Sequence, residues 1–113
     1  MLNKKYRLSK NKDFEKVFRQ GKFYSDKIVS LKFIPNQLDH NRFGIIVGLK
    51  VDRRAVVRNK VKRRLRSVIR SLFPVMKTSF DIILIAKPFI VGEDYQTIKE
   101  KIEKLFNKSG LLD

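Results

Sequence analysis

The sequence predicts an α+β fold in which helices cover one sheet, and three observations support this class. Segment 55–72 repeats apolar residues at helical spacing, segment 80–86 is a continuous apolar run, and shorter β-rich runs come earlier in the chain. The expected order is α-β-β-β-α-β-α, with two or three strands before the second helix. Because 113 residues suffice for one hydrophobic core and no repeat or linker interrupts them, we expect a single domain over residues 1–113.

The first helix is predicted over residues 9–21. Ser9 or Asn11 can cap its start, and Asp13 suits the positive end of the helix dipole. Gly21 suits the position that follows the last helical turn. The sequence therefore predicts both ends of this helix from local chemistry.

Three β-rich runs are expected to form the sheet. Residues 28–34 and 42–49 flank the turn-like segment 35–41, and we expect the two runs to pair antiparallel. The run 80–86 is apolar at nearly every position, which is typical of a strand buried on both faces. We therefore expect residues 80–86 in the middle of the sheet.

Two further helices are predicted. The second helix covers 55–72 and ends before Pro74, because proline cannot continue a helix. A last helix starts near Tyr95, has apolar residues at helical spacing, and ends at Gly110. The buried stripe of the second helix consists of Val57, Val61, Leu65, Val68, Ile69 and Leu72.

The charge balance points to a polyanionic partner. The chain has 27 Lys and Arg residues against 11 Asp and Glu residues, a formal net charge of +16. Self-repulsion of this size destabilises a compact protein unless a polyanion neutralises it. Nucleic acid and an anionic membrane surface are the two candidates.

The second helix gathers its cationic residues opposite the buried stripe, when residues are projected at about 100° each. Lys60 and Arg64 lie at the flank of this set, and Arg53 and Arg54 enlarge it just before the helix. No acidic residue occurs from Arg53 to Arg70, whereas a merely solvated face usually contains acidic i,i+4 partners. Arginine can bind a phosphate with two hydrogen bonds, and an Asn amide can hydrogen-bond a sugar, phosphate or base edge. We call the following set the basic face: Arg53, Arg54, Arg58, Asn59, Lys60, Lys62, Arg63, Arg66 and Arg70.

Membrane binding ranks below nucleic-acid binding. A membrane-surface helix exposes its apolar side for insertion, whereas the apolar stripe of this helix is needed for the core. Charge alone does not choose between DNA and RNA. Phe14 and Phe18 lie on one face of the first helix with Val17. They are either core residues or rings that stack on unpaired bases between helix and sheet.

The sequence offers no catalytic centre. It has no cysteine, its single histidine, His40, lies in a turn-like loop, and its acids form no cluster that suggests a metal site or an acid/base pair. We therefore expect no catalytic residue, no bound metal and no nuclease activity of the protein alone. The absence of cysteine, of a signal peptide and of an apolar membrane span favours a cytoplasmic protein.

Four stretches resemble the protein subunit family of bacterial ribonuclease P. The segment 53–66 is similar to the arginine-asparagine-arginine signature of that family. Segment 7–21 resembles the opening helix, Gly44 to Leu49 the strand before the signature, and Asp81 to Pro88 the last strand. These stretches span nearly the whole chain, and they occur in the order of the family.

The resemblance implies a two-layer α/β sandwich, ribosomal protein S5 domain 2-like, with a rare left-handed βαβ crossover around the basic helix. It also implies a catalytic RNA as partner, whose Mg²⁺ ions drive hydrolysis of precursor tRNA at the 5′ end of the mature sequence. In that family the protein binds the 5′ leader in a cleft between the first helix and the sheet, helps the RNA prefer precursor over product, and lowers the magnesium requirement. No further protein partner is required.

Carried over by position, the resemblance also assigns residues. Phe14 and Phe18 match aromatic residues of the leader cleft, and Lys32 stands where relatives often carry a leader-facing tyrosine. Lys60 stands where the signature usually has arginine. The connection 49–53 is short and lacks a customary basic pair, for which Arg53 and Arg54 can substitute. The residues that match the helix contacting the catalytic RNA are Arg58, Asn59, Lys60, Lys62, Arg63 and Arg66.

Two other functions remain as alternatives. A ribosomal or general RNA-binding protein would bind unrelated structured RNAs equally well and would show no preference for a 5′ leader. A metal-dependent nuclease would cleave RNA without an RNA partner and would lose activity with one specific carboxylate. The first alternative and the ribonuclease P hypothesis both require the basic face. Only the identity of the bound RNA distinguishes these two functions.

Overall fold

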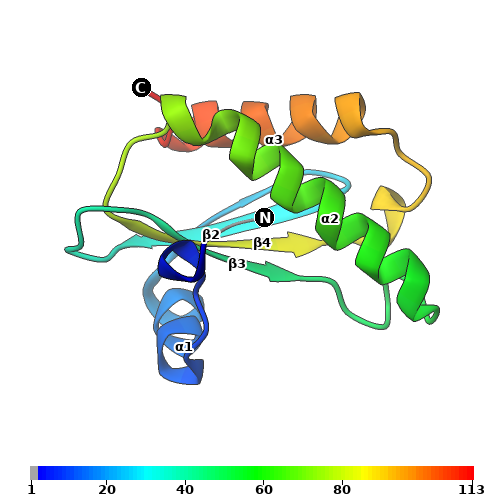
Figure 1. The fold of residues 1–113 in the computed structure, drawn as a ribbon, viewed down its shortest axis with the longest axis horizontal. Coiled ribbons are helices and arrows are strands. Elements are labelled where there is room, and N and C mark those ends of the chain that lie inside the picture. Colours follow the sequence, from blue (N-terminus) through cyan, green and yellow to red (C-terminus); the bar gives the residue numbers. More distant parts are fainter. Residues whose placement is uncertain (1–2) are drawn as a thin grey trace.

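The computed structural model describes residues 3–113 and shows one sheet with helices on both faces (Figure 1). Helices α2 and α3 cover one face of the sheet and form with it the predicted two-layer sandwich. Helix α1 lies on the opposite face. Met1 and Leu2, which belong to the expected domain 1–113, lie outside the described residues. The helices are α1 Asn11–Gln20, α2 Ala55–Leu72 and α3 Tyr95–Ser109, and the strands are β1 Lys22–Ser25, β2 Val29–Pro35, β3 Arg42–Ile46 and β4 Phe80–Ala86.

Three single 3-10 turns complete the fold: Lys4–Tyr6 (η1) before α1, Phe73–Val75 (η2) between α2 and β4, and Pro88–Ile90 (η3) between β4 and α3. The second helix has the predicted limits, and Pro74 lies in the 3-10 turn that follows it. No helix among residues 3–113 combines the length and apolar character that crossing a bilayer requires.

The strand order is β1-β2-β4-β3, which corrects one prediction. The runs predicted at 28–34 and 42–49 do not pair with each other, because β4 lies between them. Strand β4 pairs antiparallel with β2 and parallel with β3. Its central place follows from its composition, since a strand that is apolar on both sides loses most water contact between two neighbours. The antiparallel partner of β2 on its other side is β1.

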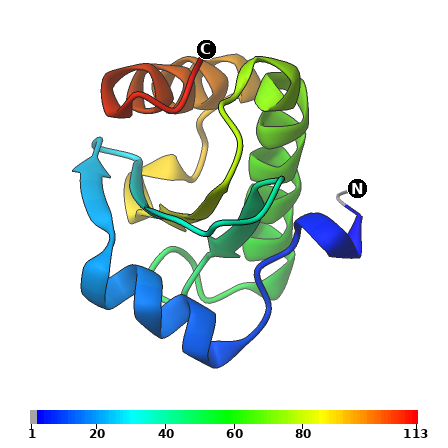
Figure 2. The ribbon, with the colours of Figure 1, turned by 90° about the vertical axis from the view of Figure 1, so that its left-hand side faces the viewer.

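The connection from β3 through α2 to β4 is left-handed. Strands β3 and β4 run in the same direction, β3 lies at the near edge of the sheet in Figure 1, and α2 crosses above them. When the sheet is viewed from the side of α2 with both strands pointing up, β4 lies to the left of β3 (Figures 1 and 2). This confirms the crossover implied by the resemblance, which is an exception to the usual handedness of such units.

The sheet separates two apolar clusters. Ile82 and Leu84 of β4 face the larger cluster, which the buried stripes of α2 and α3 complete. Ile83, the neighbour between them, faces the smaller cluster with Leu8 and Val17. Alternating side chains of one strand thus anchor both layers, as the two-residue period of a strand requires. The smaller cluster is extended by the half-buried residues Phe14, Ile34, Ile46 and Ile85.

The helix ends agree with the sequence only in part. At α3, Asp94 caps the start by accepting a hydrogen bond from the backbone N–H of Thr97 at 2.8 Å, and Gly110 ends the helix in the left-handed conformation with φ 82°. At α1 the predicted caps are wrong, because the N-cap is Lys10 and no side chain caps it. Gly21 follows α1 with extended backbone at φ −75°.

Candidate nucleic-acid interface

Helix α2 holds the basic face away from the core. Val61 is 5% exposed and Leu65 and Val68 are fully buried, so the side of α2 that packs on the sheet is fixed by apolar contacts. The opposite side of α2 faces solvent, as the view along the sheet shows (Figure 2). The structure thus brings the predicted residues of α2 onto one outer surface. Arg53, Arg54, Asn59, Lys60, Arg63 and Arg70 are exposed, and Arg58, Lys62 and Arg66 are half-buried.

The basic face has one salt bridge in the described part of the chain, between Arg54 and Asp52. The guanidinium of Arg54 donates to both carboxylate oxygens of Asp52, at 3.1 and 3.0 Å, and its backbone N–H donates at 2.9 Å. These hydrogen bonds lower the pKa of Asp52 to about 2. Asp52 is therefore ionised at neutral pH, and it orders the loop before α2.

Two arginines of α2 have structural partners. Arg58 donates to the backbone carbonyls of Asp52 and Arg53, at 3.0 and 2.8 Å, and so closes the loop onto the first turn of α2. Arg64 donates to the carbonyl of Glu93 at 2.6 Å. Part of the donor capacity of these two guanidiniums is already used within the protein.

The remaining cations of α2 form no hydrogen bond or salt bridge with other described residues, so their donors are free for a ligand. A row of such donors without internal counterions repels itself, and phosphates that bind it relieve the repulsion. These free cations are Lys60, Lys62, Arg63, Arg66 and Arg70.

A second cluster lies on the opposite face of the sheet, beside α1. Lys32 of β2 places its Nζ atom 5.5 Å from the ring centre of Phe18 and 5.8 Å from that of Phe23. The same Nζ atom donates to the backbone carbonyl of Phe18 at 2.7 Å. Phe18 is 40% exposed and Phe23 is 55% exposed. We call Phe18, Phe23 and Lys32 the aromatic cluster; it offers two ring surfaces and one ammonium to solvent.

Phe14 does not join this cluster, although the sequence pairs it with Phe18. It is half-buried, belongs to the smaller core, and lies over Gly44 of β3. With Arg7 and Arg66 it lines a cavity of about 160 Å³ at the edge of the sheet. The structure thus places Phe14 between the aromatic cluster and the basic face.

Two residues of these surfaces were missed by the sequence analysis. Phe23 lies on the short strand β1, opposite Lys32 in the register, but a stretch of four residues after a glycine is read as a loop. Arg7 comes near Arg66 only because Leu8 donates a backbone hydrogen bond to Phe43 at 2.8 Å. The adjacent aromatic residues Phe23 and Tyr24, which favour a strand, were the available signal for Phe23; nothing local indicated Arg7.

The buried carboxylate of the chain has a structural partner. Asp81 is 5% exposed and accepts hydrogen bonds from Arg42 at 2.8 and 2.7 Å and from Asn36 at 2.9 Å. Asp13 lies 3.5 Å from Arg42, and the hydrogen bonds to Asp81 raise the pKa of Arg42. His40 contacts the exposed Asp39 at 2.7 Å. Among residues 3–113, no three side chains of the metal-binding types are grouped as a metal site would require.

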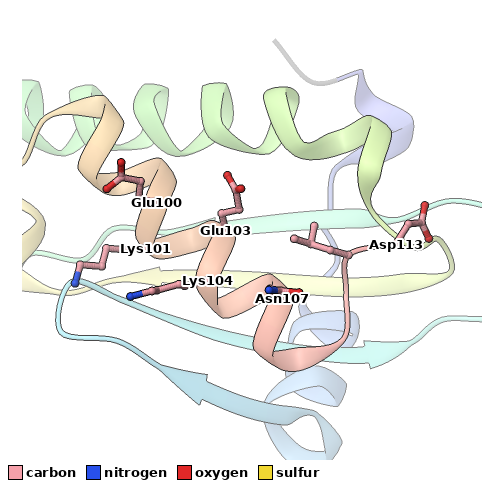
Figure 3. A pocket seen from close by; sticks show the side chains of 7 residues that line it. Glu100, Lys101, Glu103, Lys104, Asn107 and Asp113 are labelled. Carbon is pink, nitrogen blue, oxygen red and sulfur yellow. The ribbon is translucent and has the colours of Figure 1, made fainter.

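A cavity of about 490 Å³ along α3 is less suited to a polyanion. Figure 3 shows Glu100 and Glu103 projecting from the same helix as Lys101 and Lys104, with Asp113 nearby. Acidic and basic groups alternate there, so phosphates would meet repulsion as well as attraction. The basic face and the aromatic cluster remain the candidate interface.

The fold and these surfaces define a small basic α+β protein whose crossover helix carries cations without acidic partners in the described part of the chain. The family described as Ribonuclease P matches the chain over residues 2–110. The chain belongs to this family, whose members are protein components of an endoribonuclease that processes tRNA.

Relatives and solved structures agree with this assignment. The chain is 37% identical to the ribonuclease P protein component of Synechocystis sp., with 99% of this chain and 91% of that protein covered. It resembles the RNase P protein structure of Staphylococcus aureus with a TM-score of 0.87 and 28% identity, covering 96% and 98% of the two chains. For the RNase P protein of Thermotoga maritima the TM-score is 0.83 at 31% identity, covering 90% and 96%.

Proposed function

We propose that this chain is the protein subunit of a ribonuclease P ribonucleoprotein in the cytoplasm. It binds the catalytic RNA through the basic face and the 5′ leader of precursor tRNA beside α1, and it assists endonucleolytic removal of that leader. The observation that carries this proposal is the row of unpaired cations on α2 in a chain that matches the family over nearly its whole length. No other protein partner is needed.

The catalytic RNA is held mainly through its phosphates. Each phosphate bound by Arg or Lys releases counterions, so affinity falls steeply as the salt concentration rises. Arg63 and Arg66 are suited to two-point contacts with phosphate, whereas Lys60 acts as a compact charge. Asn59 adds a neutral donor and acceptor that can hydrogen-bond a sugar or a base edge.

The leader is bound on the other face of the sheet. Unpaired bases stack on aromatic rings with little regard to sequence, and Phe18 presents such a ring at the surface. Lys32 supplies a positive charge beside it for the leader backbone. Phe14 borders the path between these residues and α2. Protein contacts to the leader, which mature tRNA lacks, give the ribonucleoprotein a preference for the precursor.

The chemistry belongs to the RNA partner. The proposal assigns no catalytic residue and no metal ligand to the protein. Five of the acids described above are engaged in pairs or cap a helix: Asp13, Asp39, Asp52, Asp81 and Asp94. The catalytic RNA would hold the Mg²⁺ ions. The protein lowers the Mg²⁺ requirement because its cations take over part of the charge neutralisation that the RNA otherwise needs from ions.

Reconstitution with the catalytic RNA tests this proposal. The wild-type protein should lower the Mg²⁺ concentration needed for cleavage of precursor tRNA and should raise affinity for precursor over mature tRNA. Arg63→Ala should weaken the assembly, whereas Lys108→Ala, which removes one charge from α3, should leave it unchanged. A protein without effect on either quantity defeats the proposal.

Competition binding separates the proposal from a general RNA-binding role. With the catalytic RNA present, leader-bearing tRNA should compete better than mature tRNA. Equal competition by both, together with equal affinity for unrelated structured RNAs, would support the ribosomal or general RNA-binding alternative.

A further inference from the structure

Phe14 lies against a strand position that has no side chain. A Cβ atom at Gly44 of β3 would lie 2.6 Å from Cε1 and 2.7 Å from Cζ of Phe14. Its next neighbour, Cγ1 of Ile83, would be 3.6 Å away, which is an ordinary van der Waals contact. The outer edge of the phenyl ring therefore occupies the space that a side chain at position 44 would need.

The rest of α1 is attached to the sheet independently of this contact. Near its start, Asp13 lies 3.5 Å from the guanidinium of Arg42. Near its end, the carbonyl of Phe18 accepts the hydrogen bond from Lys32 at 2.7 Å. The Phe14 ring, by contrast, rotates about two side-chain bonds. A methyl group at position 44 would therefore displace the ring and leave the helix in place.

We infer that Gly44 is a positioning residue for the leader-binding surface. By lacking a side chain, it lets the Phe14 ring lie close to β3, which fixes where the ring meets the leader and shapes the cavity that it shares with Arg66. This inference rests on the proposed function of the α1 side of the sheet. Gly44 itself touches no ligand and acts through Phe14.

A double-mutant cycle tests the inference in the reconstituted ribonucleoprotein. The variants are Gly44→Ala, Phe14→Ala and the double variant, and the control is Gly48→Ala, whose added Cβ meets nothing within 4 Å. Gly44→Ala should reduce the preference for precursor over mature tRNA by about fivefold or more, the range for loss of one base–ring contact. In the Phe14→Ala background, Gly44→Ala should have no further effect. Gly48→Ala should retain the wild-type preference.

Affinity for the catalytic RNA is the second readout, and it should be equal in all four variants and the wild type. The inference is overturned if Gly44→Ala keeps the wild-type preference, if its effect multiplies with that of Phe14→Ala, or if it weakens binding of the catalytic RNA. A wild-type assembly that shows no preference for the precursor would instead overturn the proposed function.

Discussion

The cationic side chains of α2 differ in what they do for the protein. Arg58 donates two hydrogen bonds to the loop before the helix, whereas Arg63 is exposed and contacts no acidic group among the described residues. Arg58 and Arg63 therefore carry the same charge but differ in their contacts within the protein. Arg58 stabilises the loop, whereas Arg63 has no such internal contact among the described residues. Under the proposed function, both side chains also bind RNA.

Substitution should separate these two roles. Arg63→Ala should reduce the log-log salt slope of RNA binding by about 0.7–0.9 for one lost phosphate contact, with the free energy of unfolding changed by less than about 0.5 kcal/mol. Arg58→Ala should reduce the salt slope and, in addition, lower the free energy of unfolding by about 1 kcal/mol, because two backbone carbonyls lose a charged donor. Salt titrations and urea unfolding of both variants measure this. An unchanged slope for Arg63→Ala would remove it from the interface.

Asp52 should report on the loop through its titration. Its carboxylate accepts hydrogen bonds from Arg54, and its pKa is lowered to about 2. Since the folded pKa lies below the unfolded value of about 3.9, the stabilisation is present above that value and is lost as the pH falls towards 2. Arg54→Gln should raise the pKa part of the way, because the backbone N–H still donates. Carbon-13 NMR of the carboxyl group measures it; identical titrations would contradict the pairing.

At the scale of elements, the seam between α1 and β1 depends on close backbone approach. A Cβ at Gly21 would collide with the carbonyl oxygen of Val17 and lie 3.0 Å from that of Phe33. Both obstacles are backbone atoms, which cannot rotate away as the Phe14 ring can. The two glycines beside α1 therefore differ: Gly44 leaves room for a side chain, whereas Gly21 leaves room for the main chain.

Gly21→Ala should therefore destabilise the fold. We expect a loss of about 1–3 kcal/mol in the free energy of unfolding, the range for forced overpacking. Gly48→Ala is the matched control, since its Cβ meets no neighbour. Urea unfolding followed by circular dichroism measures both variants. Equal unfolding midpoints for Gly21→Ala and the wild type would show that α1 and β1 can move apart without loss of stability.

The sequence predicted elements better than their pairing. The limits of α2 and the central place of β4 were predicted because each depends on a local apolar pattern. In α2 the apolar residues recur every 3.6 residues, and in β4 they form a continuous run. The pairing of 28–34 with 42–49 was wrong, because neighbours in sequence usually pair and no local signal reports a strand inserted between them. The cap of α1 was also wrong: Ser9 and Asn11 suit the N-cap position, but the helix starts at Asn11 and its N-cap is Lys10.

At the scale of the molecule, the net charge of +16 acts on the folded state as a whole. Cations of α2 lie side by side without acidic partners among residues 3–113, while several acids of that range are already paired or cap a helix. Folding concentrates like charges, so anions that screen or bind them should favour the folded state.

Stability of the free protein should therefore rise with anions. Raising NaCl from about 20 to 200 mM should increase the midpoint of thermal unfolding, because screening weakens repulsion between exposed charges. Sulfate at equal ionic strength should increase the midpoint further, because it is divalent and can bind adjacent cations. Calorimetry measures both effects. A midpoint that is independent of salt would show that self-repulsion does not limit stability.

The candidate site was only partly predictable at this scale. The residues of the basic face lie on one helix, so their convergence follows from helical geometry. The aromatic cluster joins α1, β1 and β2, and the cavity beside Phe14 joins the segment after η1 with β3 and α2. Such sites depend on tertiary contacts between distant segments, and for this reason Phe23 and Arg7 were not identified from the sequence.

The insertion of β4 between two earlier strands governs the order in which the chain can assemble. Val29 of β2 pairs with Ala86, and Arg42 of β3 pairs with Asp81. Although β2 can pair earlier with β1, neither β2 nor β3 can pair with β4 until residues 80–86 have been synthesised. Helix α2 needs only local hydrogen bonds and can form while the sheet is still open. During translation, at about 5–20 residues per second, a nascent chain would thus display its cationic helix before its sheet closes.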